Sequence, residues 1–404
     1  MTVNRISLIF LCLLLNVVVS RGQEVSFKAS NFRTDKKGFK QAKQQIKEGD
    51  IFRKEGNDKV FNMQDGSSEF QKALFYYQKA YNFNSKSAEL NYKIGNCLLF
   101  TNSKAKASEY INKAVNLSSG TEDVELPSEL ALFYGMCFQL DGRYEDAIYQ
   151  YNLFKDNIKT KSYEYYKAIV EKYISECKAA PILLENPSKV WIDNLSLNSE
   201  YDDWSPCLSA DGELLIFTSN RPNENLPNKV GSYDQEIYSV SRKGRGFNDV
   251  MPIDALNTTS DDVSGGLSYD GQRLLIFKQE EENTDVFESI LLGTKWQMPK
   301  RKMGEKLKGP NTEQNETFAS YDPPDVKVYY ITDGGYNGNK NIYFSGVMNR
   351  ERNLWGAGQS AGHEINTKFQ EGSVYIHPDG KSMYFSSQGH NSIGGFDIFV
   401  SHVD

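Results

Sequence analysis

The second half of the chain carries a pattern that recurs four times. Each copy has an apolar strand, a tight turn, a second strand and an aromatic third strand, at residues 204–238, 263–287, 318–344 and 374–399. Three copies turn at Asp-Gly and the third at residues 322–325, so successive turn aspartates are 59, 52 and 57 residues apart. This spacing fits one four-stranded propeller blade with a loop to spare. The pattern therefore predicts a rigid platform.

The first 22 residues predict export from the cytoplasm. Arg5 precedes an apolar run at residues 6–19, which is too short to cross a bilayer. Ser20 and Gly22 fit the small positions before a cleavage site, which places the mature start near Gln23. Cys12 has no small residues before it, so we do not expect it to carry a lipid.

Composition indicates an ordinary globular protein of two or three domains. The chain has 404 residues, 39% apolar and 25% charged, with a net charge of -7. Residues 23–180 carry 24 basic and 21 acidic side chains, whereas residues 181–404 carry 20 and 32. An acidic second half argues against nucleic acid as its partner. The four cysteines after the signal show no disulfide framework, and we expect buried thiols at Cys97, Cys137, Cys177 and Cys207.

The first half predicts stacked helical pairs. When Gly95 is aligned with Gly135, both are followed at equal offsets by small and large apolar residues, and an earlier copy lies 34 residues before the first. This period resembles the tetratricopeptide repeat, in which small residues allow close helix crossing. The aligned positions are Ala73, Tyr77, Ala80; Ala107, Ile111, Ala114; and Ala147, Tyr151, Phe154.

Domain boundaries follow from these two patterns. Helices are expected at residues 38–54 and 161–178, and Pro181 is expected to break the second of these. We predict a multidomain α + β chain: a signal peptide at 1–22, a helical α-solenoid at 23–180, a linker at 181–188 and an all-β propeller of four recognisable blades at 189–404.

The repeated phrases of the second half resemble TolB-like propellers, a WD40-like family common in exported bacterial proteins. The resemblance rests on residues 205–212 and 375–380, and on the later phrases 217–222, 236–238, 385–387 and 396–399. Asp-Gly supplies the positive backbone angles of a tight hairpin turn. The second and third copies depart from the pattern at residues 278–282 and 322–325.

A fourth-strand signature precedes each first strand, beginning with residues 192–195. The chain therefore enters the propeller with an extra outer strand and stops after a third strand. Two explanations stay open: residues 189–195 complete the last blade, or the chain is truncated and further blades follow.

Helical repeats followed by this propeller, behind a signal peptide, resemble the layout of periplasmic scaffold proteins from Bacteroidota, some of them in type IX secretion and gliding. The resemblance implies a non-catalytic assembly factor at the inner side of the outer membrane that binds envelope proteins and needs no cofactor. The OmpA-like peptidoglycan-anchoring domain of such proteins is absent from this sequence.

The propeller face offers the first set of candidate partner-binding residues. An acidic residue stands near the start of each inner strand, at Asp203, Asp262, Glu316 and Glu371. One hypothesis is a negative ring that attracts a basic protein segment or a divalent cation. The alternative is that each carboxylate caps the backbone amides of its own loop. The loops between second and third strands add Arg221 and His390 as candidates.

The helical repeats offer the second set. Tyrosines suited to peptide capture are expected on the concave side, at Tyr76, Tyr81, Tyr110 and Tyr149. Others, such as Tyr77 and Tyr151, carry the repeat signature and are expected in the core.

We expect no enzymatic activity and no metal site. The four histidines lie in the last two repeats, and His377 and His390 are expected at opposite ends of a strand. No nucleophile elbow, zinc-protease helix or phosphate loop is present. Two alternative functions stay open: a propeller-based polysaccharide lyase or hydrolase, and a glycan- or peptidoglycan-binding module that stacks sugars on Trp191, Trp204, Trp296 or Trp355.

Overall fold

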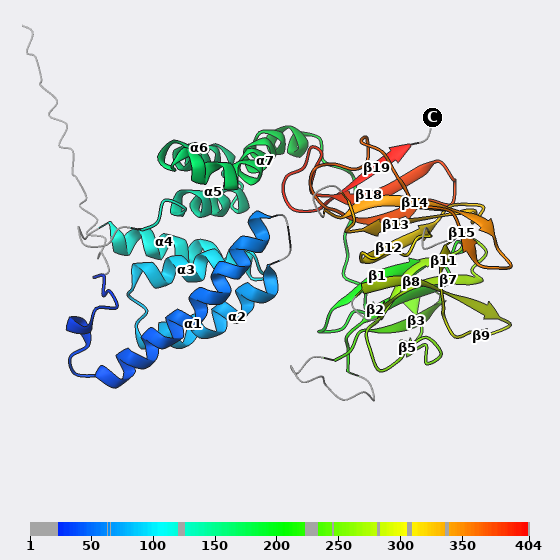
Figure 1. Cartoon of the computed structure of the whole chain (residues 1–404), viewed down its shortest axis with the longest axis horizontal. Helices are drawn as coiled ribbons and strands as arrows, with labels where there is room; N and C mark the ends of the chain where they lie inside the picture. Colours follow the sequence, from blue (N-terminus) through cyan, green and yellow to red (C-terminus); the bar gives the residue numbers. More distant parts are fainter. Residues whose placement is uncertain are drawn as a thin grey trace, which may run out of the picture. The chain divides into compact units, whose positions relative to one another are not determined.

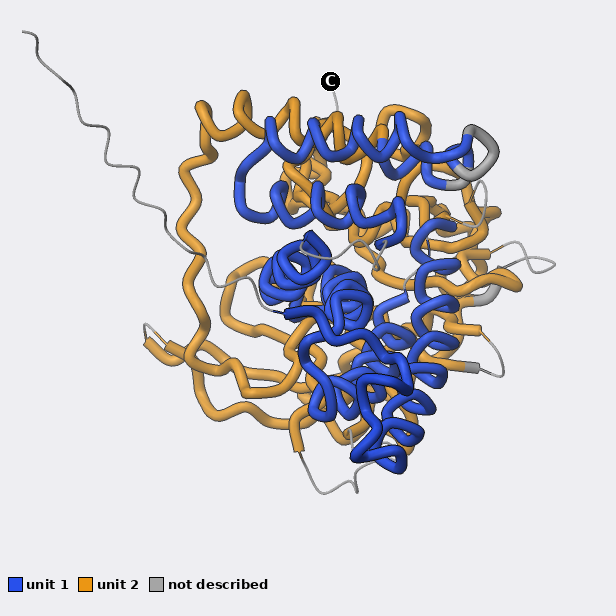
Figure 2. Tube along the Cα trace, turned by 90° about the vertical axis from the view of Figure 1, so that its left-hand side faces the viewer, with its two compact units in different colours: residues 1–170 blue, residues 171–404 orange. Residues whose placement is uncertain are grey.

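The structure is a computed structural model. It describes residues 23–62, 64, 66–119, 126–222, 233–244, 246–280, 283–304, 309–335 and 339–402. The predicted signal peptide lies outside these ranges. The chain divides into two compact units, Met1–Val170 and Glu171–Asp404, which are coloured separately in Figure 2.

The first unit consists of paired helices (Figure 1). The pairs are α1 (Lys36–Phe61) with α2 (Ser67–Phe83), α3 (Ala88–Leu99) with α4 (Ala107–Ser118), and α5 (Leu130–Leu140) with α6 (Tyr144–Asn157). Two short 3-10 helices, η1 (Ala29–Phe32) and η2 (Lys104–Lys106), precede α1 and α4. The predicted helical region of paired helices is confirmed.

Glycines set the close contact within each pair. A Cβ atom on Gly135 would lie 2.6 Å from the Tyr151 ring, and one on Gly95 would lie 2.6 Å from Ile111. In the first pair Gly49 has this role against Tyr77, at 2.5 Å. The predicted small positions on the second helices are fully buried, at Ala73, Ala80, Ala107, Ala114 and Ala147.

The helix α7 (Thr160–Glu185) is longer than predicted. It contains Pro181, so the expectation that this proline breaks the helix is wrong. Proline removes one backbone hydrogen bond, and here it stands in the last turn, where few bonds remain to be lost. Five residues of the predicted linker are therefore helical. Residues 171–185 of α7 belong to the second compact unit.

The second unit is a four-bladed β-propeller. Blade 1 holds β1 (Asp203–Leu208), β2 (Leu214–Ser219), β3 (Glu236–Lys243), β4 (Gly246–Phe247) and β5 (Met251–Pro252). Blade 2 holds β6 (Asp262–Leu267), β7 (Arg273–Glu280), β8 (Asn283–Leu292), β9 (Lys295–Trp296) and β10 (Lys300–Arg301). Blade 3 holds β12 (Glu316–Tyr321), β13 (Lys327–Thr332), β14 (Asn341–Asn349), β15 (Leu354–Trp355) and β16 (Gln359–Ser360), and β11 (Met303–Gly304) pairs with β15. Blade 4 holds β17 (Glu371–Ile376), β18 (Ser382–Ser387) and β19 (Asp397–His402).

Apolar side chains between neighbouring blades form the core. The inner strands β1, β6, β12 and β17 contact one another in this order. Ile216 of blade 1 packs with Ile276 of blade 2, Leu275 of blade 2 with Val328 of blade 3, and Ile331 of blade 3 with Val374 of blade 4. Each junction is therefore a separate apolar layer between two sheets.

The predicted turns are confirmed, and the third has its own solution. Gly212, Gly271 and Gly380 have φ of +73°, +70° and +65°, which glycine adopts without strain. In blade 3 the non-glycine residue Asp325 takes the same region, with φ of +66°. Residues 189–195 lie outside every sheet, and Trp191 and Ile192 are 87% and 92% exposed.

No helix in the described ranges combines the length and the apolar character that a bilayer crossing needs.

Candidate functional site

The four predicted carboxylates occupy equivalent places at one end of the propeller. Asp203, Asp262, Glu316 and Glu371 are the first residues of the inner strands β1, β6, β12 and β17. In each blade the carboxylate residue pairs with a residue near the end of the second strand. These partners are Ser219, Lys278, Thr332 and Ser387. We call these four acidic residues the rim carboxylates.

Each rim carboxylate caps the loop that leads into its strand. The residue four positions earlier donates both its N–H and its hydroxyl group to the carboxylate. At Asp262 these bonds from Thr258 measure 2.5 and 2.8 Å, and at Glu371 those from Thr367 measure 3.2 and 2.8 Å. Ser199 and Thr312 do the same for Asp203 and Glu316. The self-capping alternative is thus confirmed for all four residues.

In blades 1 and 2 a basic side chain neutralises the rim carboxylate. Arg221 Nη2 lies 2.6 Å from Asp203 Oδ1, and Lys278 Nζ lies 2.6 Å from Asp262 Oδ1. Burial opposes ionisation of Asp203, but hydrogen bonds from Ser219, Arg221 and Ser199 outweigh it and lower its pKa. Arg221 also donates to the Leu197 carbonyl oxygen at 3.2 Å. This arginine is therefore part of the structural framework of blade 1.

In blades 3 and 4 burial and hydroxyl groups replace that basic partner. Glu316 is fully buried, and burial raises its pKa to about 7, although Thr312 and Thr332 donate hydrogen bonds to it. Burial also raises the pKa of Glu371, which accepts from Ser387 at 2.9 Å and from Asn341 at 3.3 Å. The rim therefore carries less negative charge than four exposed carboxylates would. Partner binding by these residues stays a prediction.

His390 is packed inside blade 4. Its Nε2 atom lies 3.1 Å from the Ile365 carbonyl oxygen, and its ring lies 5.5 Å from that of Phe385 and 5.0 Å from that of Phe399. It borders a cavity of about 210 Å³ together with Lys172 and Phe369. His377 instead contacts Asp379 in the turn after the inner strand, as the predicted separation of the two histidines requires.

Metal chemistry finds no group of ligands in the part of the chain that the structure describes. There, no three His, Cys, Asp or Glu side chains are arranged to hold a metal ion. The four cysteines are free and buried, which confirms the predicted thiols.

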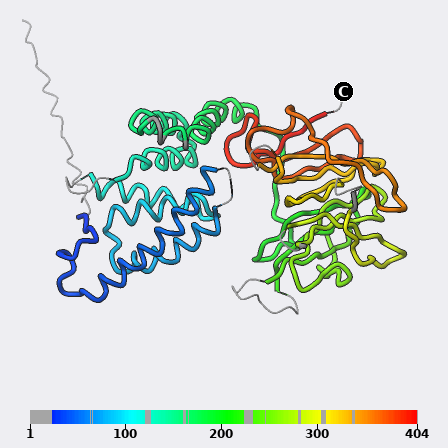
Figure 3. Tube along the Cα trace, viewed as in Figure 1, coloured from blue at the N-terminus to red at the C-terminus, as the bar shows by residue number. Residues whose placement is uncertain are grey.

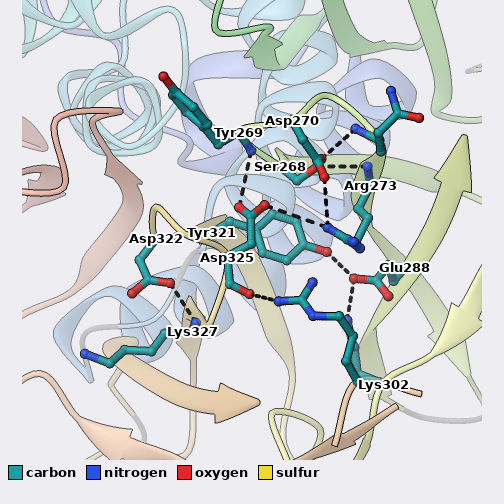
Figure 4. Close-up of polar contacts among 12 residues, drawn as sticks. Ser268, Tyr269, Asp270, Arg273, Glu288, Lys302, Tyr321, Asp322, Asp325 and Lys327 are labelled. Atoms are coloured by element: carbon teal, nitrogen blue, oxygen red, sulfur yellow. Dashed lines mark hydrogen bonds and ion pairs between the residues drawn. The ribbon is translucent and has the colours of Figure 1, made fainter. Parts of the chain in front are cut away.

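A buried polar network joins blades 2 and 3 at the opposite end of the inner strands (Figure 4). Asp325 Oδ1 accepts the Tyr269 N–H of the neighbouring blade at 3.2 Å, and its Oδ2 lies 3.7 Å from Arg273 Nη1. The Lys302 Nζ atom lies 2.6 Å from Glu288, which also accepts from the Tyr321 hydroxyl. Burial lowers the pKa of Lys302 to about 8. The unusual third turn therefore links two blades, a role that the sequence pattern did not reveal.

The four predicted tyrosines lie on the second helices of their pairs. Tyr76 and Tyr81 are on α2, Tyr110 on α4 and Tyr149 on α6. Tyr81 and Tyr110 contact each other at 5.6 Å between ring centroids, and Tyr149 is 65% exposed. Contacts between first helices, α1 with α3 and α3 with α5, mark these helices as the inner layer of the curved stack. The tyrosines therefore lie on the outer layer, which corrects the expected concave location.

An exposed aromatic and basic cluster on α2 was missed by the sequence analysis. Phe75 is 59% exposed, and Lys79 Nζ lies 3.8 Å from its ring centroid. Tyr76 contacts Phe75 at 5.3 Å and stacks on Phe52 of α1 at 5.8 Å. Lys72 Nζ lies 5.8 Å from the Phe52 ring. We call Phe52, Lys72, Phe75, Tyr76 and Lys79 the α2 patch. An i, i+4 spacing of Phe75 and Lys79 was the available signal.

The tryptophans are mostly structural. Trp204 packs on Phe318 at 5.8 Å, and Trp355 is buried beneath Lys302, whose Nζ lies 4.1 Å from its ring centroid. Trp296 and Trp355 pair with the third strands of their blades, as their predicted equivalence requires. Trp191 is the exposed member of the four.

Comparison with known proteins finds distant likeness of fold. No family model and no curated protein matches the sequence. Among solved structures, a TolB-type protein from Agrobacterium tumefaciens matches with 14% identity and a TM-score of 0.33, over 48% of this chain and 58% of the other. The periplasmic gluconolactonase of Pseudomonas aeruginosa gives 9%, 0.29, 49% and 57%. The α-L-arabinofuranosidase of Lactobacillus brevis gives 10%, 0.32, 50% and 72%.

These matches set the propeller beside TolB and beside hydrolases. The chain spans less than two thirds of the length of the first two matched proteins. At this distance the likeness concerns fold alone, and function is argued from the residues of this chain.

Proposed function

We propose that this chain is a non-catalytic adaptor that binds protein partners through its helical repeats and its propeller face. The observation that carries the proposal is the α2 patch. Exposed phenylalanine and tyrosine beside two lysines offer apolar area together with positive charge. Protein interfaces are enriched in aromatic residues, which lose little side-chain entropy on binding.

The chemistry of the patch defines the partner. Lys79 and Lys72 lie over aromatic rings, and such ammonium groups can also pair with carboxylates. The best-fitting partner is thus a protein segment that combines acidic and apolar side chains. This partner complements the first half of the chain, where basic residues slightly outnumber acidic ones.

The rim carboxylates support a binding role better than a catalytic one. A general acid–base pair needs groups that can exchange protons with a substrate. Here each carboxylate is held by its own loop, and Asp262, Glu316 and Glu371 are fully buried. The propeller therefore serves as a rigid platform whose loops contact the partner.

The resemblance to periplasmic scaffold proteins extends the proposal. It places the adaptor in the periplasm, in an outer-membrane-associated assembly of the type IX secretion kind. The predicted signal peptide supports this location, since it directs the chain out of the cytoplasm.

The test is site-specific photo-crosslinking at position 75 in the native envelope, followed by mass spectrometry. We expect defined protein partners whose yield falls at least about tenfold when Tyr76→Ala and Lys79→Ala are introduced together. Gln71→Ala, an exposed change on the same helix, is the matched control and should leave the yield unchanged. Retention on cell-wall material without any crosslinked protein would instead favour the glycan-binding alternative.

A further inference from the structure

Three asparagines fasten the outer segments of the propeller to the blades. Asn257 accepts the N–H of Ile237 at 2.7 Å and donates to its carbonyl oxygen at 3.1 Å. Asn311 makes the same two bonds with Val286, at 2.7 and 2.9 Å, and Asn366 makes them with Ile342, at 2.7 and 2.8 Å. Each asparagine directly precedes the threonine that caps the next rim carboxylate. One loop therefore joins two blades.

The residues held by these asparagines are fully buried. Ile237, Val286 and Ile342 each have 0% exposure and stand second in the third strands that begin at Glu236, Asp285 and Asn341. The equivalent residue of blade 4 is Ile398, the second residue of β19, and it is 80% exposed. Among the described strands β19 pairs with β18 alone. Blade 4 thus presents an unpaired apolar edge.

A fourth copy of the fastening loop exists at residues 197–199. Asn198 directly precedes Ser199, which caps Asp203 as Thr258 caps Asp262. Leu197 packs against blade 1, and its carbonyl oxygen accepts from Arg221. The Asn198 amide donates to Asn194 at 2.5 Å and holds no strand. The chain therefore has one asparagine and one strand edge that lack the partners found at every other junction.

This segment connects the two blades that flank the gap. Before it, Lys172 of α7 lies over the Phe369 ring of the loop entering blade 4, at 5.6 Å. After it, Ser199 is bonded to blade 1, and Figure 3 traces the chain between these points. A cavity of about 270 Å³ is lined by Cys207 and Leu208 of blade 1 and by Tyr375, Tyr384 and Ile398 of blade 4. We call this opening the seam.

We propose that residues 190–198 of the same chain act as a strap that closes the seam. Asn198 bonds the backbone N–H and carbonyl of Ile398, and residues 191–193 add antiparallel to β19. This places the exposed Trp191 and Ile192 side chains beside the apolar face of blade 4. The strap is tethered at both ends, so closure costs less entropy than recruitment of a second molecule. The present structure shows the strap open.

Hydrogen exchange across β19 tests the proposal. We expect the Ile398 amide of the full chain to exchange slowly, and Asn198→Ala to speed it by about tenfold or more. Asn257→Ala should change exchange at Ile237 to a similar extent and serves as the internal standard. Asn194→Ala, in the same segment, is the matched control and should leave Ile398 unaffected. Fast exchange at Ile398 in the wild type, or equal exchange in wild type and Asn198→Ala, would overturn the strap.

A crosslink separates closure within one chain from closure between chains. With Ile192→Cys and Val400→Cys, mild oxidation should give a monomer containing the 192–400 disulfide. A covalent dimer would show that a second copy supplies the strap, which contradicts the proposal. Absence of either product would contradict it as well, and Ile192→Cys alone controls for reaction with the buried native thiols.

Discussion

At the scale of single residues, the acidic positions that look like a binding ring are mainly structural. The sequence placed Asp203, Asp262, Glu316 and Glu371 correctly at the starts of inner strands, because turn spacing is visible in the repeat. It could not show that a hydroxyl residue four positions earlier caps each one. Their different neutralisation by Arg221 or by burial depends on side chains that meet only in three dimensions.

Glu316 makes stability depend on pH. Its pKa in the folded protein, raised by burial to about 7, exceeds that of an exposed glutamate, about 4.3. The folded protein therefore keeps a proton that the unfolded chain releases, and this residue's contribution to stability falls as pH rises from about 4 to about 7. In urea titrations, Glu316→Gln should gain about 1–3 kcal/mol relative to the wild type across this window.

The exposed neighbour Glu313→Gln is the control and should preserve the wild-type pH dependence. Parallel pH profiles for the wild type and Glu316→Gln would show that Glu316 is ionised throughout.

Asp262 should be the costliest rim residue to replace. Asp262→Asn leaves Lys278 without its carboxylate beside a fully buried position, and we expect a loss of about 2–4 kcal/mol in the free energy of unfolding. Asp261→Asn, next in the chain and exposed, accepts one hydrogen bond from the Gln235 N–H and should cost less than about 1 kcal/mol. Equal losses in chemical denaturation would refute the buried pair as the cause.

At the scale of elements, prediction succeeded where a repeat imposes the geometry. Gly95 and Gly135 revealed the helical pairs because they recur at equal offsets from Ile111 and Tyr151. Gly49 escaped detection because α1 is 26 residues long and its glycine stands further from Tyr77. The end of α7 was misplaced because proline near a helix terminus is tolerated, which local sequence does not distinguish from a break.

Gly135→Ala should destabilise the helical repeats despite the better helix propensity of alanine. The new methyl group would lie 2.6 Å from the Tyr151 ring, so we expect a net loss of about 1–3 kcal/mol after a propensity gain of about 1 kcal/mol. Gly246→Ala, which meets no atom within 4 Å, should stay within about 0.5 kcal/mol of wild type. Thermal unfolding followed by circular dichroism would show the difference. An unchanged midpoint for Gly135→Ala would mean that the helix pair relaxes freely.

At the scale of the whole molecule, two compact units combine different kinds of surface. The helical unit exposes the α2 patch, whereas the propeller fixes its polar groups in loops and in the network of Figure 4. Fold class followed from sequence because both units are repeats. The binding surface did not, because exposure of Phe75 depends on which helix faces its neighbours.

The adaptor proposal is tested most directly by photo-crosslinking from position 75 of the full chain in its native envelope. Our account predicts defined protein adducts that are lost when Tyr76→Ala and Lys79→Ala are combined and retained with Gln71→Ala. Adducts that persist unchanged in the double variant, or the absence of any protein adduct, would contradict it.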